Sequence, residues 1–204
     1  MFRNTMTTLT QRVSTLAKRK GVLRSRDLDL AGIPRVHLGR ATAQGLVVRV
    51  GRGLYIPAEA DITEEHSLAE AARRVPNGVL CLLTALQFHG MTTQLPYQVW
   101  VAIDPKARLP KPASPPLRIV RFSGIALNFG VEHHMIEKVA VRIFSPSKTV
   151  ADCFKYRNKI GLDVAIEALR DCLGQRKATR DALADAAKAC RVSAVMRPYL
   201  EALS

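Results

Sequence analysis

The stretch from Ser25 to Pro57 constrains the fold more than any other part of this 204-residue chain. It begins with a short polar helix, turns at Gly32-Ile33-Pro34, continues into a second helix that ends near Gly45, and finishes in a basic hairpin. Pro34 stands where a helix tolerates a missing N–H, in its first turn. Apolar, β-branched runs flank Gly51-Arg52-Gly53, which predicts the hairpin. This order of elements predicts a winged helix-turn-helix, a module that reads DNA.

A helical wheel divides the second helix into two faces. One face carries a guanidinium and an amide, Arg40 and Gln44, which are groups that pair with base edges in the major groove. The other face is small or apolar, and we expect it to pack on neighbouring helices. The first face holds Val36, His37, Arg40, Ala43 and Gln44, and the second holds Leu38, Ala41, Thr42 and Gly45.

The residues expected at DNA fall into three groups. Base reading is assigned to His37, Arg40 and Gln44, with Val36 beside them. Phosphate or minor-groove contact is assigned to Arg35, Arg49 and Arg52, the last at the tip of the wing between two glycines. The run Lys18-Arg19-Lys20 fits a phosphate contact and equally well the basic end of a helix that Gly21 terminates. Both interpretations of this run stay open.

Charge favours the DNA-binding hypothesis over a small helical domain with a solvated basic face. Residues 1–57 hold eleven Lys and Arg against two Asp, so they contribute +9 of the formal net charge of +14. A positive field this concentrated matches a polyanion, whose phosphates supply most sequence-independent affinity. Residues 58–204 hold twenty basic and fifteen acidic residues. We therefore expect two domains, 1–57 and 58–204, with the boundary near Ala58 to Thr63.

Composition limits the class of protein. A hydrophobic content of 48% supports a packed core. No run approaches the roughly 20 apolar residues of a spanning helix, and the first residues lack an apolar signal core, so we expect a cytoplasmic protein without membrane contact. Buried reduced thiols are expected rather than a disulfide frame or a zinc site, because the cysteines show no paired spacing. They are Cys81, Cys153, Cys172 and Cys190.

The pattern of residues 58–204 predicts an α+β domain with a small sheet and a helical C-terminal tail. Strands are expected at 97–103, 117–122, 131–136 and 139–144, and the proline-rich stretch 104–116 is expected to be a loop. Helices are expected at 64–75, 79–89, from Ser145 as N-cap with Pro146 in the first turn, from Gly161, at 179–190 and at 193–203.

Residues that suggest catalysis have simpler explanations. His133 and His134 would point to opposite faces of a strand, so they cannot easily share a metal. His89 follows an apolar helix and is interpreted as a packed histidine. Ser145-Pro146-Ser147-Lys148 has the composition of a serine–lysine nucleophile, but a capped helix start explains it and no partner base is evident. Asp104 and Asp152 lack a second carboxylate at a recognisable spacing. We expect no catalytic residues, no metal and no cofactor.

A second basic patch is possible on the C-terminal domain. The alternative, which we favour, is an ordinary solvated helix face. The residues concerned are Arg73, Arg74, Lys148, Lys155, Arg157 and Lys159.

Three stretches resemble one known family. Asp27 to Arg35, continuing through Gly45-Leu46-Val47 to Gly51-Arg52-Gly53-Leu54-Tyr55, resembles the N-terminal winged-helix domain of the AbiEi antitoxins of type IV toxin–antitoxin systems. Leu83 to Pro96 and Ser145 to Arg157 look like the C-terminal region of that family. The similarity covers nearly the whole chain.

The resemblance implies a transcriptional repressor that is also an antitoxin. The N-terminal domain would bind inverted repeats in the promoter of its own operon, as double-stranded DNA. The C-terminal domain would counteract a co-encoded nucleotidyltransferase-like toxin without forming a stable complex with it. Two alternatives stay open: a nuclease that the winged helix directs to DNA, and a regulator whose C-terminal domain senses a ligand or a partner.

Overall fold

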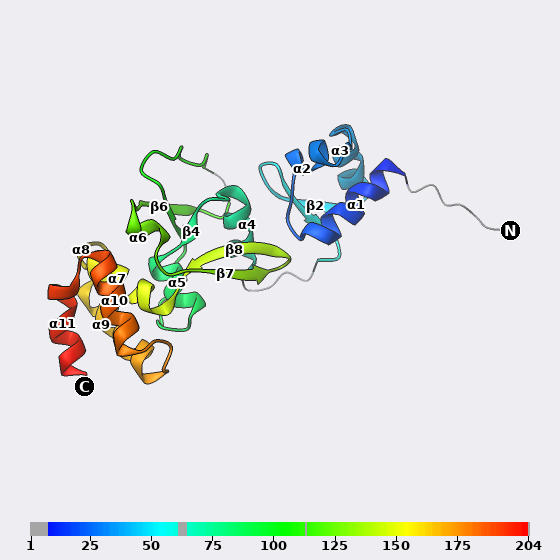
Figure 1. The fold of residues 1–204 in the computed structure, drawn as a ribbon. Coiled ribbons are helices and arrows are strands. Elements are labelled where there is room, and N and C mark those ends of the chain that lie inside the picture. Colours follow the sequence, from blue (N-terminus) through cyan, green and yellow to red (C-terminus); the bar gives the residue numbers. More distant parts are fainter. Residues whose placement is uncertain (1–7, 61–64, 113, 204) are drawn as a thin grey trace.

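Figure 1 shows the computed structural model, which describes residues 8–60, 65–112 and 114–203. Residues 8–60 form one lobe, here called the head, and residues 65–203 form the body, a sheet followed by a bundle of helices (Figure 1). The α+β prediction, with a winged helix-turn-helix first and a small sheet and helical tail second, is confirmed. Part of the predicted domain boundary, residues 61–63, lies outside the described residues.

The head contains three helices and a three-stranded antiparallel sheet in the order β1-β3-β2. The second described helix, the turn and the third helix follow one another as predicted, and the hairpin of β2 and β3 forms the wing. The third helix begins after Arg35, so Pro34 lies just before the first turn and not in it. The elements are α1 (Leu9–Lys20), β1 (Leu23–Arg24), α2 (Ser25–Leu30), α3 (Val36–Ala43), β2 (Val47–Gly51) and β3 (Leu54–Pro57).

Local signals define the ends of these elements. Thr8 and Gln11 form a reciprocal capping box at the start of α1, which satisfies two backbone N–H groups. Gly21 ends α1 with a φ of 68°. The apolar stripe of α1 then packs on α2 and α3 to form the core of the head. This core contains Val13, Leu16, Ala17, Leu23, Leu28, Ile33, Leu38, Ala41 and Val47.

The body is built on a mixed five-stranded sheet in the order β6-β5-β4-β8-β7. Strands β5 and β6 are parallel, and β7 and β8 form an antiparallel hairpin whose turn is Glu137-Lys138. The elements are α4 (His66–Arg74), β4 (Val79–Leu80), α5 (Leu82–Phe88), β5 (Val99–Ile103), β6 (Leu117–Arg121), α6 (Ile125–Asn128), β7 (Val131–Ile136), β8 (Val139–Phe144), α7 (Pro146–Lys155), α8 (Arg157–Ile160), α9 (Leu162–Gly174), α10 (Arg180–Cys190) and α11 (Ser193–Ala202).

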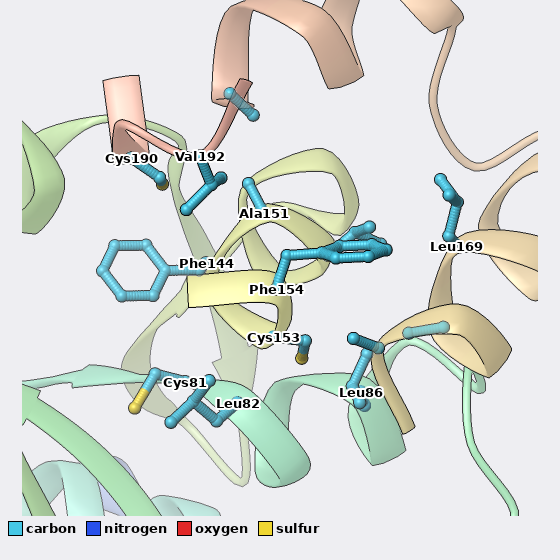
Figure 2. Close-up of a cluster of buried hydrophobic side chains, with 14 of the residues drawn as sticks. Cys81, Leu82, Leu86, Phe144, Ala151, Cys153, Phe154, Leu169, Cys190 and Val192 are labelled. Atoms are coloured by element: carbon cyan, nitrogen blue, oxygen red, sulfur yellow. The ribbon is translucent and has the colours of Figure 1, made fainter. Parts of the chain in front are cut away.

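Alternation along the strands gives the sheet two apolar faces. On one face, Val101 of β5 and Ile143 of β8 pack with Leu68 of α4. On the other, Ala102 and Phe144 pack with the helices that follow the sheet. Figure 2 shows the second core, in which Phe144 and Phe154 are surrounded by side chains from α5, α7, α9 and α10. The cysteines are buried and unpaired, as predicted, and three of them are labelled in this view.

Most predicted elements of the body are confirmed, and the main difference lies at a buried strand in the centre of the sheet. Val79 and Leu80 were predicted to open a helix, but they form β4 at the centre of the sheet. A continuous apolar run does not distinguish a buried strand from a buried helix. Strand β5 starts at Val99, so Tyr97 lies in the preceding loop, and the one-turn helices α6 and α8 were not predicted.

The head and the body share a hydrophobic cluster. Leu54 and Ile56 of the wing pack with Leu68 of α4 and with residues of the sheet. Polar contacts surround this cluster: Arg73 of α4 pairs with the buried Asp27 of α2. The two lobes are therefore packed against each other through apolar and charged groups together.

The turn of the β7–β8 hairpin also touches the head. A Cβ built on Gly21 would overlap the carbonyl oxygen of Glu137. Beside it, the Lys138 ammonium donates to the carbonyl of Lys18 at 2.9 Å. Two features therefore require a glycine at position 21: its positive φ and the close approach of this turn.

Candidate nucleic-acid interface

The outer face of α3 is exposed, and its inner face is packed as predicted at two positions. Leu38 and Ala41 are buried in the head core, whereas Arg40 and Gln44 are exposed. Val36 stands 58% exposed at the start of the helix. Thr42 was predicted on the packed face but is exposed. Its hydroxyl donates to the carbonyl of Leu38 at 2.9 Å within the helix.

His37 differs from the other residues assigned to base reading. Its ring is half-buried, and Nδ1 lies 3.3 Å from the hydroxyl of Thr10 on α1. The ring therefore faces the contact between α1 and α3. The wheel placed His37 beside Arg40 because it cannot show where a neighbouring helix passes.

Arg35 is bound by a local carboxylate. Its Nε and Nη2 donate to the two oxygens of Asp29 at 2.9 and 2.5 Å, in a bidentate pair. The hydrogen bond from Arg35 lowers the pKa of Asp29. Both side chains are exposed, so the pair contributes little to stability and orients Arg35 at the start of α3.

The wing presents two arginines on its exposed surface. Arg52 lies at the tip, between Gly51 and Gly53, and Gly53 takes a φ of 72°. Arg49 lies on β2, three residues before Arg52, and its Nε donates to the carbonyl of Gly51 at 3.2 Å. The register shift between Arg49 and Gly51 marks a bulge, which turns the end of β2 relative to β3.

A hollow of about 380 Å³ joins the wing to the start of α2 and to the proline-rich loop of the body. Six cationic side chains line it, and none of the described residues that line it is Asp or Glu. Burial, together with the charges of Arg26 and Arg73, lowers the pKa of Arg24. A hollow lined by six cationic side chains and by no acidic one among its described lining residues favours an anion such as a phosphate. The cations are Arg24, Arg26, Arg35, Arg52, Arg74 and Lys111.

Sequence patterns assigned Arg35 and Arg52 to DNA and named Arg74 in the possible second basic patch, but they did not single out Arg24, Arg26 or Lys111. Arg74 is positioned by the loop, since its guanidinium donates to the carbonyls of Lys111, at 3.0 Å, and Pro115. Residues 24–26 and 111 are far apart in the chain. The alternation Arg24-Ser25-Arg26 was the available signal, but nothing local connects it to the proline-rich loop.

The run Lys18-Arg19-Lys20 forms the last turn of α1, where basic residues favour the helix dipole. Lys18 pairs with Glu59 at 2.8 Å, and Lys20 pairs with Asp27 at 3.1 Å. The run therefore ends a helix, and its contact with phosphates stays a prediction. Arg19 lines a separate shallow hollow beside Arg12.

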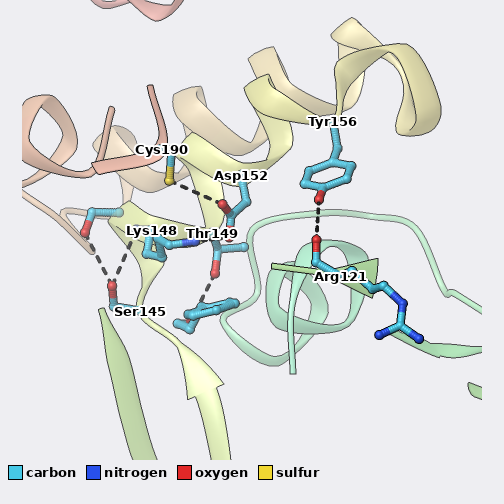
Figure 3. A network of polar contacts seen from close by, with 9 residues as sticks. Arg121, Ser145, Lys148, Thr149, Asp152, Tyr156 and Cys190 are labelled. Carbon is cyan, nitrogen blue, oxygen red and sulfur yellow. Dashed lines mark hydrogen bonds and ion pairs between the residues drawn. The ribbon is translucent and has the colours of Figure 1, made fainter. Parts of the chain in front are cut away.

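One residue of the predicted second basic patch is in the interior. Lys148 is completely buried, and its ammonium pairs with Asp152 at 2.5 Å and lies 4.0 Å from the ring centroid of Phe144 (Figure 3). Its assignment to a solvated surface was wrong because α7 is covered on both sides, by the sheet and by α10. Lys155 and Lys159 are exposed.

The Lys148 pair forms part of a closed polar network. Ser145 caps α7 by accepting from the Lys148 backbone N–H at 3.4 Å, and the Cys190 thiol donates to Asp152 at 3.3 Å (Figure 3). Burial, together with the charge of Asp152, raises the pKa of Cys190 to about 12. The capped-helix interpretation of residues 145–148 therefore agrees with the structure.

His89 and His134 of the body are held by neighbours. His89 contacts the carbonyl of Phe144 through Nε2 at 2.8 Å and packs on Phe88, as a packed histidine does. His134 lies 3.1 Å from a Glu132 oxygen. Within the described ranges, no group of three or more His, Cys, Asp or Glu side chains is arranged to hold a metal ion. Nor does any helix there have the length and apolar character to cross a membrane.

Comparison with solved structures places the fold among known ones. The crystal structure of the RV2827C protein from Mycobacterium tuberculosis aligns with a TM-score of 0.59 and 15% sequence identity, over 95% of this chain and 80% of that chain. At this identity the likeness is one of fold. None of the curated proteins matches the chain by sequence.

The head also matches a protein family by sequence. Residues 11–58, which run from α1 to the end of the wing, match the family described as "Transcriptional regulator, AbiEi antitoxin". The matched range coincides with the helix-turn-helix and its hairpin. The resemblance to the AbiEi antitoxins is therefore confirmed for the head.

Proposed function

We propose that this protein represses its own operon by binding inverted repeats in the promoter DNA, and that it is the antitoxin of a co-encoded nucleotidyltransferase-like toxin in the cytoplasm. The observation that carries the proposal is the head: a family match to transcriptional regulators on a helix-turn-helix whose exposed face carries Arg40 and Gln44. Domain 1–57 would bind the DNA, and domain 58–204 would supply the antitoxin function.

In the proposed complex, α3 lies in the major groove. Arg40 and Gln44 read base edges there, since a guanidinium pairs with guanine and an amide with adenine. Arg49 and Arg52 follow the phosphates or the minor groove from the wing. His37 supports α3 from the side of α1 through Thr10. Val36 adds an apolar contact at the start of the helix.

The arginine-lined hollow extends the proposed DNA footprint. Arg35, paired with Asp29, borders both α3 and this hollow. A phosphate beside the wing tip would meet the cations there at once, and phosphate contacts fix the position of a protein on DNA without reading sequence. Lys18 and Arg19, at the end of α1, are proposed as outer phosphate contacts.

The toxin is proposed as a functional partner without a stable complex. Support comes from two stretches of the body, residues 83–96 and 145–157, which resemble the C-terminal region of the AbiEi family. In this protein they form α5 with its following loop, and α7, which pack together.

Binding to promoter DNA tests the reading face. Arg40→Ala should relax base preference at one position, at a cost of about 1–3 kcal/mol on the specific site. Arg52→Ala should weaken binding to all sequences and reduce the salt slope by about one. Arg170→Ala, which removes an exposed arginine from α9 of the body, is the matched control. If Arg40→Ala and Arg52→Ala both bind promoter DNA like the parent, the assigned face is wrong.

Co-expression with the neighbouring gene product tests the antitoxin role. The parent chain should rescue growth, and Arg40→Ala should rescue it when both genes are driven from an unrelated promoter. A regulator that only senses a ligand would leave the cells arrested in both cases.

A further inference from the structure

A second hollow lies entirely on the body, away from α3 and the wing in sequence. It is bounded by α5, the loop before β5, the starts of β5 and β6, and α8. Two cations line it, and none of the described residues lining it is acidic. The polar and aromatic side chains that line it are Gln94, Tyr97, Gln98, Trp100, Arg118 and Lys159.

The sheet fixes one wall of this hollow. Trp100 of β5 and Arg118 of β6 are partners in the parallel register, so their side chains stand side by side on one face. The guanidinium carbon of Arg118 lies 5.6 Å from the centre of the Trp100 ring. On α8, the Lys159 ammonium lies 5.5 Å from the ring centre of Tyr156. Both cations are thus held on aromatic faces at the border of the hollow.

The loop before β5 adds apolar side chains that are open to solvent. Tyr97 is 85% exposed and Leu95 is 83% exposed. Their loop is tethered at Thr93, whose backbone N–H and hydroxyl both donate to Glu167 of α9 at 3.2 Å. An aromatic ring left this exposed on an anchored loop contributes little to the core, so its surface is available to a ligand.

We propose that this hollow binds an unstacked base of a single-stranded nucleic acid, with Tyr97 as the stacking platform. Proteins that bind single strands combine an aromatic platform with cations that follow the phosphates. Tyr97 would be the platform here, and Arg118 and Lys159 of the same hollow would be the cations. The amides of Gln94 and Gln98 can donate to and accept from base edges. A protein partner would be expected to meet an apolar surface with a mixed-charge border, and this border carries cations alone among the lining residues.

Binding of short oligonucleotides to the full chain tests this site. The probes are fluorescein-labelled oligo(U) and oligo(dT) of about ten nucleotides, within the usual size of a single-strand site, and the promoter duplex. Tyr97→Ala should weaken single-strand binding by about five-fold to a hundred-fold, the range for loss of one base–aromatic stack. Tyr97→Phe should retain the affinity, and Tyr97→Ala should leave binding of the duplex unchanged.

Two controls separate this site from the head. Arg52→Ala should weaken duplex binding and spare the single strands. Met135→Ala removes another strongly exposed apolar side chain, 71% exposed on β7, and should change neither. Binding of oligo(U) alone would identify RNA as the ligand, and binding of both probes would identify single strands in general.

An unchanged single-strand affinity in Tyr97→Ala would overturn the proposal and would leave Leu95 and Tyr97 to a protein partner. A single-strand affinity that falls with Arg52→Ala instead would overturn it as well, by assigning those strands to the head. Both results are independent of whether the head binds its promoter.

Discussion

Asp27 and Asp152 are both buried carboxylates paired with cations, but they lie in different settings. Asp152 is four residues after its partner Lys148 on α7, and both side chains are completely enclosed in the body. Asp27 belongs to α2 of the head and is bound by Lys20 of the head and Arg73 of the body. Lys20 keeps 32% of its side chain exposed. One pair is internal to a helix, and the other joins two lobes.

The two settings shift the pKa in opposite directions. Burial raises the pKa of Asp152 and outweighs the attraction of Lys148. Burial also acts to raise the pKa of Asp27, but the backbone N–H of Arg24 and the cations Lys20 and Arg73 together lower it. The difference teaches that a buried carboxylate with several donors favours its charged form, whereas a fully enclosed one with a single cationic partner holds its charge at a cost.

The largest expected effect comes from Asp152→Ala. The change leaves the Lys148 ammonium buried against Phe122 and Phe144 without its carboxylate, and such a loss costs about 3–5 kcal/mol. Urea unfolding measures it. Adding Lys148→Met should restore most of the free energy of unfolding, since an apolar side chain of similar length suits this core. If Asp152→Ala lowers the free energy of unfolding by less than about 1 kcal/mol, or if the double variant does not recover it, the enclosed pair does not hold its charges at a cost.

Gly21→Ala should have the next largest effect, about 2–4 kcal/mol on the free energy of unfolding. A left-handed backbone costs an alanine about 1–2 kcal/mol, and overlap with the Glu137 carbonyl adds to it. Gly32→Ala is the matched control, because Gly32 has a φ of 65° and a Cβ there meets nothing within 4 Å. Equal losses in the two variants would show that the turn of the hairpin moves away freely.

Asp27→Asn should cost about 1–2 kcal/mol at neutral pH, because hydrogen bonds from charged donors are weakened and Lys20 is partly solvated. The pKa of Asp27 is lowered in the folded protein, so its stabilisation is present above the ordinary Asp pKa and is lost as the pH falls through the folded value. The difference between variant and parent, measured by urea unfolding from pH 7 downwards, should therefore shrink below about pH 4. A difference that grows on acidification would mean that the pKa is raised.

The smallest effect is expected from Lys18→Ala, within about 0.5 kcal/mol, because the Lys18–Glu59 pair is exposed. The same variant distinguishes the two roles of this lysine. A helix end alone leaves promoter binding unchanged, whereas a phosphate contact weakens it at all sequences and lowers the salt slope by about one.

Local signals made much of this fold predictable. Ser145 was predicted as the N-cap of α7, which its side chain is, because it accepts from a backbone N–H within one turn. The starts of α9 and α10 were predicted within one residue, at Gly161 and Thr179. The wing was predictable for the same reason, from Gly51 to Gly53. These features depend on neighbours in the chain.

Features that depend on distant neighbours were not predictable. β4 is defined by strands on both of its sides, so a two-residue run gave no signal of its own. Lys148 looks like a surface residue until the sheet and α10 enclose its helix. The arginine-lined hollow takes its cations from residues 24–26, 35, 52, 74 and 111, which meet only when the head packs on the body.

The fit between Gly21 and the Glu137 carbonyl limits how this protein can exchange parts with its relatives. A head transplanted from another chain would need a residue without a side chain at this position, and the recipient would need a hairpin turn of matching height. Otherwise the incoming lobe would tilt and separate Arg73 from Asp27. Chimeras that keep their own junction are therefore the ones expected to fold.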